Sequence, residues 1–398
     1  MISSYYYFLK SISIVCISFF YSLEFFCQDY PVYNDEKQIT VNELTFDAME
    51  PFITPDGNYL FFNCSNESVI VKLFYASRVN DSTFNFEGEL NGPNQEAAQC
   101  LDAVADIDSL NNFYWTSTRD YPGEFENLFH GTFTEGSVSN IGRVRGGFYI
   151  YIPGWLIMDH GISCNGEFLY FNNARLDAAS CTGPCETHIG IAQKQNDSTF
   201  NVLANSDEIL QNVNDDDYIY YAPCISGDNL ELYFTRYLKG EITESTIVEM
   251  CVAVRNNSTE VFSEPNVLFA DVIANIAEAA TLTSDKQIMY YHKKIDDEYK
   301  IMMRYRESAT GYVQNIYDTS PVKVIPNPVI ESAVIRIDQH AESISSMKLI
   351  DSVGRVVFEF DNPERNTIVF QKNNLQAGIY YIKINTREES FTEEVVIQ

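Results

Sequence analysis

Short apolar stretches separated by tight polar turns recur along the first three quarters of the chain. The stretch from Glu50 to Asn63, EPFITPDGNYLFFN, has an apolar run, a Pro-Asp-Gly turn and a second apolar run. Pro55 fixes its own φ, and Gly57 can adopt φ > 0, so the turn follows from local chemistry. The pattern predicts two strands joined by a hairpin.

Four further copies of this unit follow along the chain. Aligned on the acidic or amide residue of the turn, the five units lie at Asp56, Asp108, Asn165, Asp228 and Asp285. The second copy fits only with a slip of one residue. The segment NDSTFN at 80–85 returns letter for letter at 196–201, two units later. Four short strands in a period of about 50–60 residues are typical of propeller blades.

We therefore predict an all-β fold with a five-bladed β-propeller over residues 28–308. The blades are expected at about 46–90, 97–144, 157–203, 218–268 and 276–308. The last unit has three strands and lacks an obvious fourth. Residues 39–44, ITVNEL, resemble a fourth strand, so we expect this segment to complete the last blade and to close the ring without a long free edge.

The repeated unit resembles the TolB-like, WD-like propeller repeat, which has a similar strand, Pro-Asp-Gly turn and aromatic strand. The resemblance extends over about residues 38–308, and only the first unit has the full Pro-Asp-Gly. It implies a propeller fold and leaves the function open, because such folds carry many activities.

The N-terminus has the features of a secretory signal peptide over residues 1–27. Lys10 precedes an apolar run, SISIVCISFFYSL, that is too short to span a membrane. We expect cleavage after Cys27. The alternative is a lipoprotein acylated at Cys27, although the bulky Phe26 precedes it where a small residue is expected.

Alternating strands return after a polar linker at 309–321. Residues 322–398 predict a small Ig-like β-sandwich. This end resembles the C-terminal sorting domain of the type IX secretion system of Bacteroidetes-type bacteria. The matching residues are Pro326, Asn327, Pro328, Gly354, Arg355, Leu375, Gly378 and Tyr380. One departure is Glu393-Glu394, where family members often have Lys. The resemblance implies the type IX machinery as a partner and export through the periplasm, so that the protein is secreted or held on the outer cell surface.

The net charge and the cysteine content limit the kinds of site that the protein is expected to carry. The net charge is −30, from 56 acidic and 26 basic residues, which argues against nucleic-acid binding. Cys181 and Cys185 could close a small disulfide loop in an oxidising compartment. A zinc site there is not expected, because only His188 is near in sequence.

Three carboxylates stand six residues before the turn residue of their repeat, namely Glu50, Asp102 and Asp159. The first strand of a propeller blade lines the channel, so this register predicts a cation or ligand site there, with Ca²⁺ as the candidate ion. The structural alternative is that each carboxylate caps a loop or bonds to a neighbouring blade, and Ala222 and Ala279 at the other two positions favour it. His160, next to Asp159, is a candidate acid or base, or a hydrogen-bonded structural histidine.

Known motifs for a catalytic nucleophile, a zinc protease or a phosphate loop do not occur in the sequence. We therefore expect a binding or scaffold module for an extracellular ligand, either a glycan or a protein. The alternative is a carbohydrate-active hydrolase or lyase that uses the channel carboxylates. A third hypothesis, an envelope structural protein anchored through Cys27, predicts lipid labelling of that cysteine.

Overall fold

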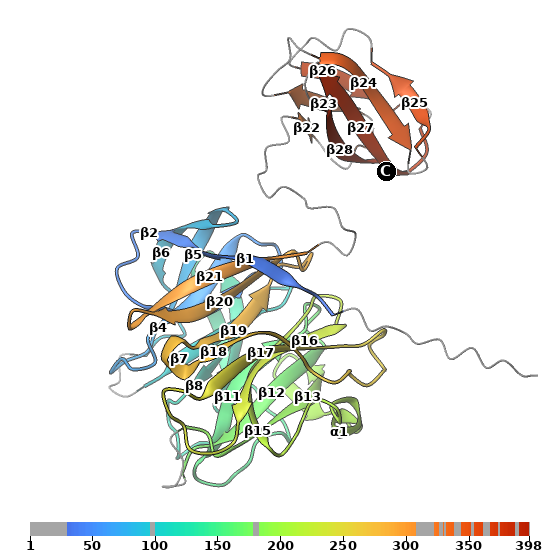
Figure 1. Cartoon of the computed structure of the whole chain (residues 1–398). Coiled ribbons are helices and arrows are strands. Elements are labelled where there is room, and N and C mark those ends of the chain that lie inside the picture. Colours follow the sequence, from blue (N-terminus) through green and yellow to red (C-terminus); the bar gives the residue numbers. More distant parts are fainter. Residues whose placement is uncertain are drawn as a thin grey trace, which may run out of the picture. The chain divides into compact units, whose positions relative to one another are not determined.

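The computed structural model describes two compact units, divided between Glu307 and Ser308. The residues described are 30–95, 100–177, 183–307, 322–325, 329, 332–337, 344–351, 354–360, 367–372, 375–386 and 390–397. The predicted signal peptide, Cys27 and the linker at 309–321 lie outside these residues. Strands dominate both units (Figure 1). In the described part, no helix is long and apolar enough to cross a membrane.

The first unit contains five small sheets, antiparallel except where β2 joins the first one, and the core strands of four of them follow directly in chain order (Figure 1). The first sheet is β3 (Ala48–Ile53), β4 (Tyr59–Cys64), β5 (Leu73–Asn80) and β6 (Thr83–Glu89); the second is β7 (Asp102–Ile107), β8 (Asn112–Ser117), β9 (Leu128–Thr134) and β10 (Ser137–Arg143). The third is β11 (Trp155–Ile162), β12 (Phe168–Arg175), β13 (Glu186–Asn196) and β14 (Thr199–Val202); the fourth is β15 (Tyr218–Ile225), β16 (Glu231–Leu238), β17 (Ile247–Val254) and β18 (Asn266–Val272). Two short helices, α1 (Ser206–Ile209) and η1 (Ile273–Asn275), lie in the connections.

The fifth sheet combines both ends of this unit. It contains β19 (Ala277–Leu282), β20 (Ile288–Ile295) and β21 (Glu298–Arg306), and its outer strand is β1 (Tyr33–Gln38), antiparallel to β21. The prediction that residues 39–44 complete this sheet was wrong in its residues. Ile39 still donates its N–H to the carbonyl of Ile301 at 3.0 Å, but β2 (Thr40–Asn42) pairs in parallel with β6 of the first sheet. The closing strand, YNDEKQ, is an outer edge with one buried residue, so it lacks the apolar alternation by which a strand is recognised.

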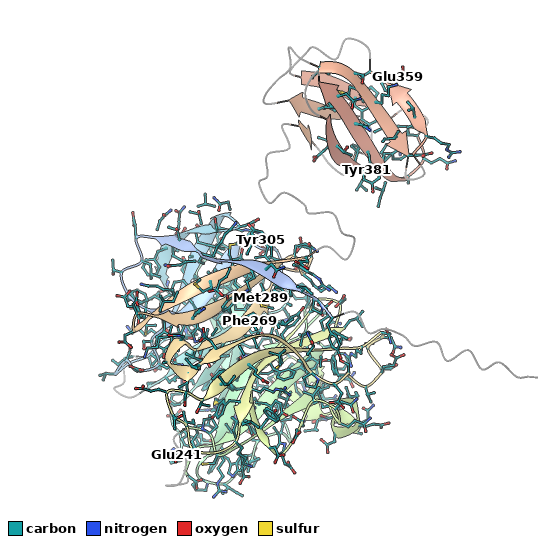
Figure 2. All side chains as sticks on the ribbon, in the orientation of Figure 1. Glu241, Phe269, Met289, Tyr305, Glu359 and Tyr381 are labelled. Atoms are coloured by element: carbon teal, nitrogen blue, oxygen red, sulfur yellow. The ribbon has the colours of Figure 1, made fainter. Side chains whose placement is uncertain are left out.

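The five sheets pack in a closed cycle. We use "first strands" for β3, β7, β11, β15 and β19, and each of them contacts the first strand of the next sheet, with β19 contacting β3. Five hydrophobic clusters lie between successive sheets, including one between the fifth and the first. Figure 2 shows the side chains that fill this unit.

Along the second strand of each sheet, successive side chains pack alternately into the clusters shared with the two neighbouring sheets. On β4, Phe61 packs into the cluster shared with the second sheet, while Leu60 and Phe62 pack into the cluster shared with the fifth. Successive side chains of a strand point to opposite faces, so a strand between two neighbours is apolar throughout. Burying each of these side chains stabilises the fold by about 1.5–3 kcal/mol.

The repeated turns share one hydrogen-bond pattern. Thr54 donates its hydroxyl to Asp56 Oδ1 at 2.6 Å, and the backbone N–H of Asn58 donates to the same oxygen at 3.0 Å. The same two bonds recur in the turns of Asn165, Asp228 and Asp285. The second repeat differs, because Asp108 itself takes the place of Thr54: its backbone N–H donates to the carbonyl of Asn112, and its Oδ1 accepts the N–H of Leu110 at 2.9 Å.

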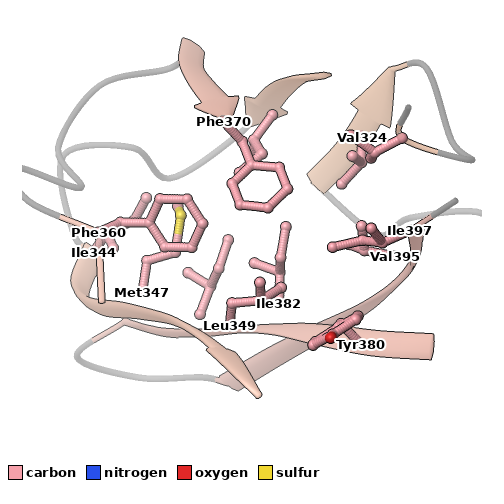
Figure 3. Close-up of a cluster of buried hydrophobic side chains, with 13 residues drawn as sticks. Val324, Ile344, Met347, Leu349, Phe360, Phe370, Tyr380, Ile382, Val395 and Ile397 are labelled. Atoms are coloured by element: carbon pink, nitrogen blue, oxygen red, sulfur yellow. The ribbon is translucent and has the colours of Figure 1, made fainter. Parts of the chain in front are cut away.

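The second unit contains two sheets around one core. One sheet is β22 (Val322–Ile325), β23 (Ser332–Ile337) and β26 (Thr367–Gln371); the other is β25 (Val356–Glu359), β24 (Ile344–Asp351), β27 (Gly378–Thr386) and β28 (Ser390–Ile397). Apolar side chains from both sheets, among them Ile335, Phe370, Leu349 and Ile382, form a single buried cluster (Figure 3).

Candidate functional site

A cluster of ionisable side chains gathers where the first strands meet. We use "central cluster" for Glu50, Asp159, Tyr221, Glu278 and His292, which come from β3, β11, β15, β19 and β20. Burial raises the pKa of Asp159 well above its usual range, and the charges of Glu50 and Glu278 raise it further. Three carboxylates separated by more than a hundred residues in sequence therefore act on one another.

Hydrogen bonds fix the imidazole of His292 within this cluster. Its Nδ1 accepts the backbone N–H of Glu50 at 3.0 Å, so the proton of the neutral ring must be on Nε2. Nε2 then donates to Glu278 Oε1 at 3.0 Å. The hydroxyl of Tyr221 donates to Glu278 Oε2, so both oxygens of Glu278 accept a hydrogen bond. The ring of His292 and the carboxylate of Glu278 are therefore both held by directed hydrogen bonds.

The other two carboxyls are held nearer to neutrality. Burial raises the pKa of Glu50, although His292 and a 2.8 Å hydrogen bond from the Asn66 amide act in the opposite direction. Asp159 Oδ2 accepts the backbone N–H of Ala222 at 3.1 Å. The cluster therefore combines a carboxylate that accepts on both oxygens with two carboxyls whose burial favours the protonated form.

Asp102 lies apart from this cluster. It is fully buried, where Oδ1 forms an ion pair of 2.6 Å with Arg119 Nη2 and Oδ2 accepts the N–H of Gln95 at 2.9 Å. The residue of the second sheet that corresponds to Glu50 is Val104, because both have a positive φ, 55° and 52°, at the same bulge of a first strand. The turn of the second repeat is displaced by two residues relative to the other turns. Counting back six residues from Asp108 therefore reaches Asp102 instead of Val104. For Asp102 the structural alternative therefore holds, in which the carboxylate bonds to neighbouring segments of the chain and does not face the channel site.

His160 is 4% exposed, and burial lowers its pKa to about 3. It is therefore neutral at physiological pH and does not titrate there as an acid or base. Successive strand residues point to opposite faces, so His160 does not share the face of Asp159.

The Ca²⁺ site expected from the sequence stays a prediction. Within the described ranges, no group of three or more His, Cys, Asp or Glu side chains is arranged to hold an ion. Cys185 is disulfide-bonded, and its predicted partner Cys181 lies outside the described residues, so that pairing stays a prediction. Free thiols occur at Cys64, Cys100, Cys164, Cys224 and Cys251.

Three residues of the central cluster, Tyr221, Glu278 and His292, were missed by sequence reasoning. A signal existed for His292, because a polar residue follows the aromatic run of every second strand, at Asn63, Thr116, Asn172, Thr235 and His292. These side chains are all buried, and three of them accept a backbone N–H from the next sheet in the cycle. The position thus joins neighbouring sheets, and in the fifth sheet it also reaches Glu278.

Residues 323–398 match the family model for the secretion system C-terminal sorting domain. They form a type IX secretion sorting domain. The protein is therefore exported by type IX secretion to the cell surface or the extracellular space, and this domain interacts with the secretion machinery. Within the sorting domain, Gly354 has φ +85° in a turn, Gly378 begins β27, and Tyr380 donates its hydroxyl to the carbonyl of Gln376 at 2.9 Å. Pro326, Asn327 and Pro328 lie outside the described residues.

Several solved structures resemble the chain at low identity. Zg3597, a family 117 glycoside hydrolase from Zobellia galactanivorans, is 10% identical with a TM-score of 0.41, over 70% of this chain and 90% of that one. The catalytic domain of a GH62 α-L-arabinofuranosidase from Coprinopsis cinerea is 11% identical with a TM-score of 0.44, over 69% and 96%. TolB from Acinetobacter baumannii is 10% identical with a TM-score of 0.33, over 66% and 55%. No curated protein has a matching sequence.

Proposed function

We propose that residues 30–307 form a five-bladed β-propeller that acts outside the cell as a binding module. Support for the five blades comes from the closed cycle of contacts between first strands and from the five hydrophobic clusters between successive sheets. Each sheet is one blade, and the N-terminal strand β1 completes the fifth. The sorting domain delivers this propeller to its site of action, and its two sheets around one core support the Ig-like sandwich expected from the sequence.

The ligand, a glycan or a protein, is recognised at the central cluster. The observation that carries this proposal is a pair of buried polar atoms without a hydrogen-bond partner in the described structure, Glu50 Oε2 and the hydroxyl of Tyr237. Tyr237 packs edge-on against Tyr221 with ring centroids 6.1 Å apart, and both lie in the field of Glu278. Buried polar groups are nearly always paired, so one unpaired oxygen in the central cluster and another on the ring beside Tyr221 favour a bound partner that pairs with both.

A binding screen tests this proposal. The mature protein is screened against glycan and extracellular-protein arrays, and each hit is measured by calorimetry with Glu50→Gln and Glu278→Gln. Both substitutions should weaken binding about tenfold or more, since each changes a charge or acceptor in the cluster. Glu208→Gln, at an exposed carboxylate in α1, is the matched control. Equal affinity for all four proteins would remove the ligand from the cluster.

The alternative is a carbohydrate-active enzyme, hydrolase or lyase. One observation favours it: Glu50 and Asp159 have raised pKa values beside a carboxylate that accepts two hydrogen bonds, and a carboxyl held neutral is what a general acid requires. Incubation with a panel of polysaccharides separates the two functions. Release of reducing ends or unsaturated products that disappears in Asp159→Asn supports the enzyme, and binding without products supports the binding module.

A further inference from the structure

An open hollow of about 620 Å³ lies beside the second sheet, and none of the residues that line it belongs to the central cluster. Its lining consists of Asp120, Gly123, Glu124, Arg143 and Arg145. These residues come from the β8–β9 loop, from the end of β10 and from the segment that leads to β11. The volume is in the range of small-molecule sites, whereas the lining is charged rather than apolar.

The loop that borders the hollow is fixed to the third sheet. Asn127 donates its amide to the carbonyl of Ile157 at 2.7 Å and accepts the N–H of Ile157 at 3.0 Å. Tyr121 accepts the N–H of Gly154 through its hydroxyl at 2.7 Å. The two segments around the hollow are therefore held together by directed bonds, so the hollow exists before any ligand arrives.

An exposed aromatic ring is connected to the lining residue Arg145 through Glu126. Tyr151 is 59% exposed, yet its hydroxyl donates to Glu126 Oε1 at 3.1 Å, and its ring contacts those of Phe125 and Tyr149 edge-on at 5.9 and 6.4 Å. Tyr149 belongs to the buried cluster between the second and third sheets. The ring of Tyr151 is thus exposed and already held in place, so a ligand that binds to it loses little side-chain conformational entropy.

Guanidinium and carboxylate groups alternate around the same place. Glu126 forms an ion pair with Arg145, and its carbonyl accepts a bond from Arg143, which also pairs with Asp120 Oδ2 at 2.7 Å. The Arg145 side chain is 56% exposed and retains N–H donors for a ligand. The lining has two carboxylates and two guanidiniums, and Glu126, which pairs with Arg145 next to it, adds a third carboxylate. The charge of the group is one negative, which disfavours an acidic ligand.

We propose that this hollow is a second binding site, for a neutral saccharide residue. A sugar hydroxyl both donates and accepts, so adjacent hydroxyls fit between Arg145 and the carboxylates of Asp120 and Glu124. The apolar face of the sugar ring lies on the ring of Tyr151. This site is separate from the central cluster and goes beyond the binding proposed there.

Calorimetry with the mature chain tests the site, using cellohexaose, xylohexaose, mannohexaose and laminarihexaose as neutral probes and hexagalacturonate as the charged one. At least one neutral probe should bind, and hexagalacturonate should bind more weakly. Tyr151→Ala and Arg145→Gln should each weaken binding about tenfold, and Tyr151→Phe, which keeps the ring, by less than about threefold. The matched control is Arg175→Gln, because Arg175 is also partly exposed and ion-paired, with Asp177 and Glu186.

The proposal is overturned if none of the neutral probes binds, if hexagalacturonate binds best, or if Tyr151→Ala binds as well as the unsubstituted protein. Loss of binding in Glu278→Gln alone would assign the saccharide to the central cluster, which overturns the second site and leaves the proposed function standing. Thermal unfolding of each variant is the folding control, and Tyr151→Ala should unfold at the temperature of the unsubstituted protein because the side chain is exposed.

Discussion

His292 accepts the backbone N–H of Glu50 at 3.0 Å, across 242 positions of the chain. The bond joins the second strand of the fifth sheet to the first strand of the first sheet. Asn63 accepts the N–H of Val104 at 3.3 Å in the same way, between the first and second sheets. The bond of His292 is thus one of a repeated set, and it is the one at which the cycle closes.

Removing this acceptor should destabilise the first unit. His292→Ala leaves a buried N–H of Glu50 unpaired, which costs about 1–3 kcal/mol. His292→Asn should cost less, because asparagine is the native acceptor at Asn63 and its amide oxygen can take the same bond. Denaturant unfolding of both variants measures the difference. Equal stability of the alanine and asparagine variants would show that the bond contributes nothing.

The raised pKa of Asp159 predicts how stability changes with pH. A carboxyl whose folded pKa lies above its unfolded value contributes stability that is present below the unfolded pKa, about 3.9, and is lost as pH rises through the folded pKa. Asp159→Asn keeps an oxygen that can accept the N–H of Ala222 and removes the titration. The variant should therefore gain stability relative to the unsubstituted protein as pH rises from about 4, by up to about 1.4 kcal/mol per pH unit.

Asp56 supplies the control of opposite sign. Burial acts to raise its pKa, but hydrogen bonds from Thr54 and Asn58 outweigh this and lower it. Its contribution is present above the unfolded pKa and is lost as pH falls through the folded pKa. Asp56→Asn should therefore lose stability relative to the unsubstituted protein at neutral pH and recover it in acid. Parallel pH profiles for the two variants would contradict both assignments.

The strand β1 should be held by Glu36. Its carboxylate accepts from Lys293 at 3.0 Å and from the hydroxyl of Tyr291 at 2.9 Å, and it also pairs with Arg304. Glu36→Ala should cost about 1–3 kcal/mol, since bonds to charged groups are stronger than neutral ones. Hydrogen exchange at β21 should then rise. Asp35→Asn, next to it at φ +57°, is the control, because asparagine tolerates that backbone.

Deleting residues 323–398 should separate export from folding. The hydrophobic clusters of residues 30–307 contain no residue of the sorting domain, so thermal unfolding of the shortened protein should keep the transition of the first unit. In the native host the shortened protein should accumulate in the periplasm and be missing from the cell surface and the medium. Immunoblots of cell fractions measure this, and its appearance outside the cell would contradict the role of the tail.

The sequence predicted the all-β class and the sorting domain because both depend on local patterns. Turn chemistry at Asp56, Asn165, Asp228 and Asp285 gave the repeat, and the aromatic strand after each turn gave the buried second strand. The closing strand could not be predicted in the same way, since Tyr33–Gln38 is polar and is recognised only by its partner β21.

The candidate site was predicted for Glu50 and Asp159 and missed for the residues that connect them. Glu278 and Tyr221 precede the alanines at 279 and 222 by one residue, so alignment on a single register passed over both. Asp102 was misassigned because the displaced turn of the second repeat shifts its register by two residues relative to Val104. Such slips are invisible until the pairing between strands is known.

The pairing of β1 with β21 has a consequence for how the protein can be made. While the C-terminal part of the first unit is still missing, β1 has no strand to pair with and the last completed sheet has an unpaired edge. Synthesis from the N-terminus therefore gives no intermediate in which all strand edges are covered. The ring of sheets can therefore be completed only after both extremities of the unit are present in the same compartment.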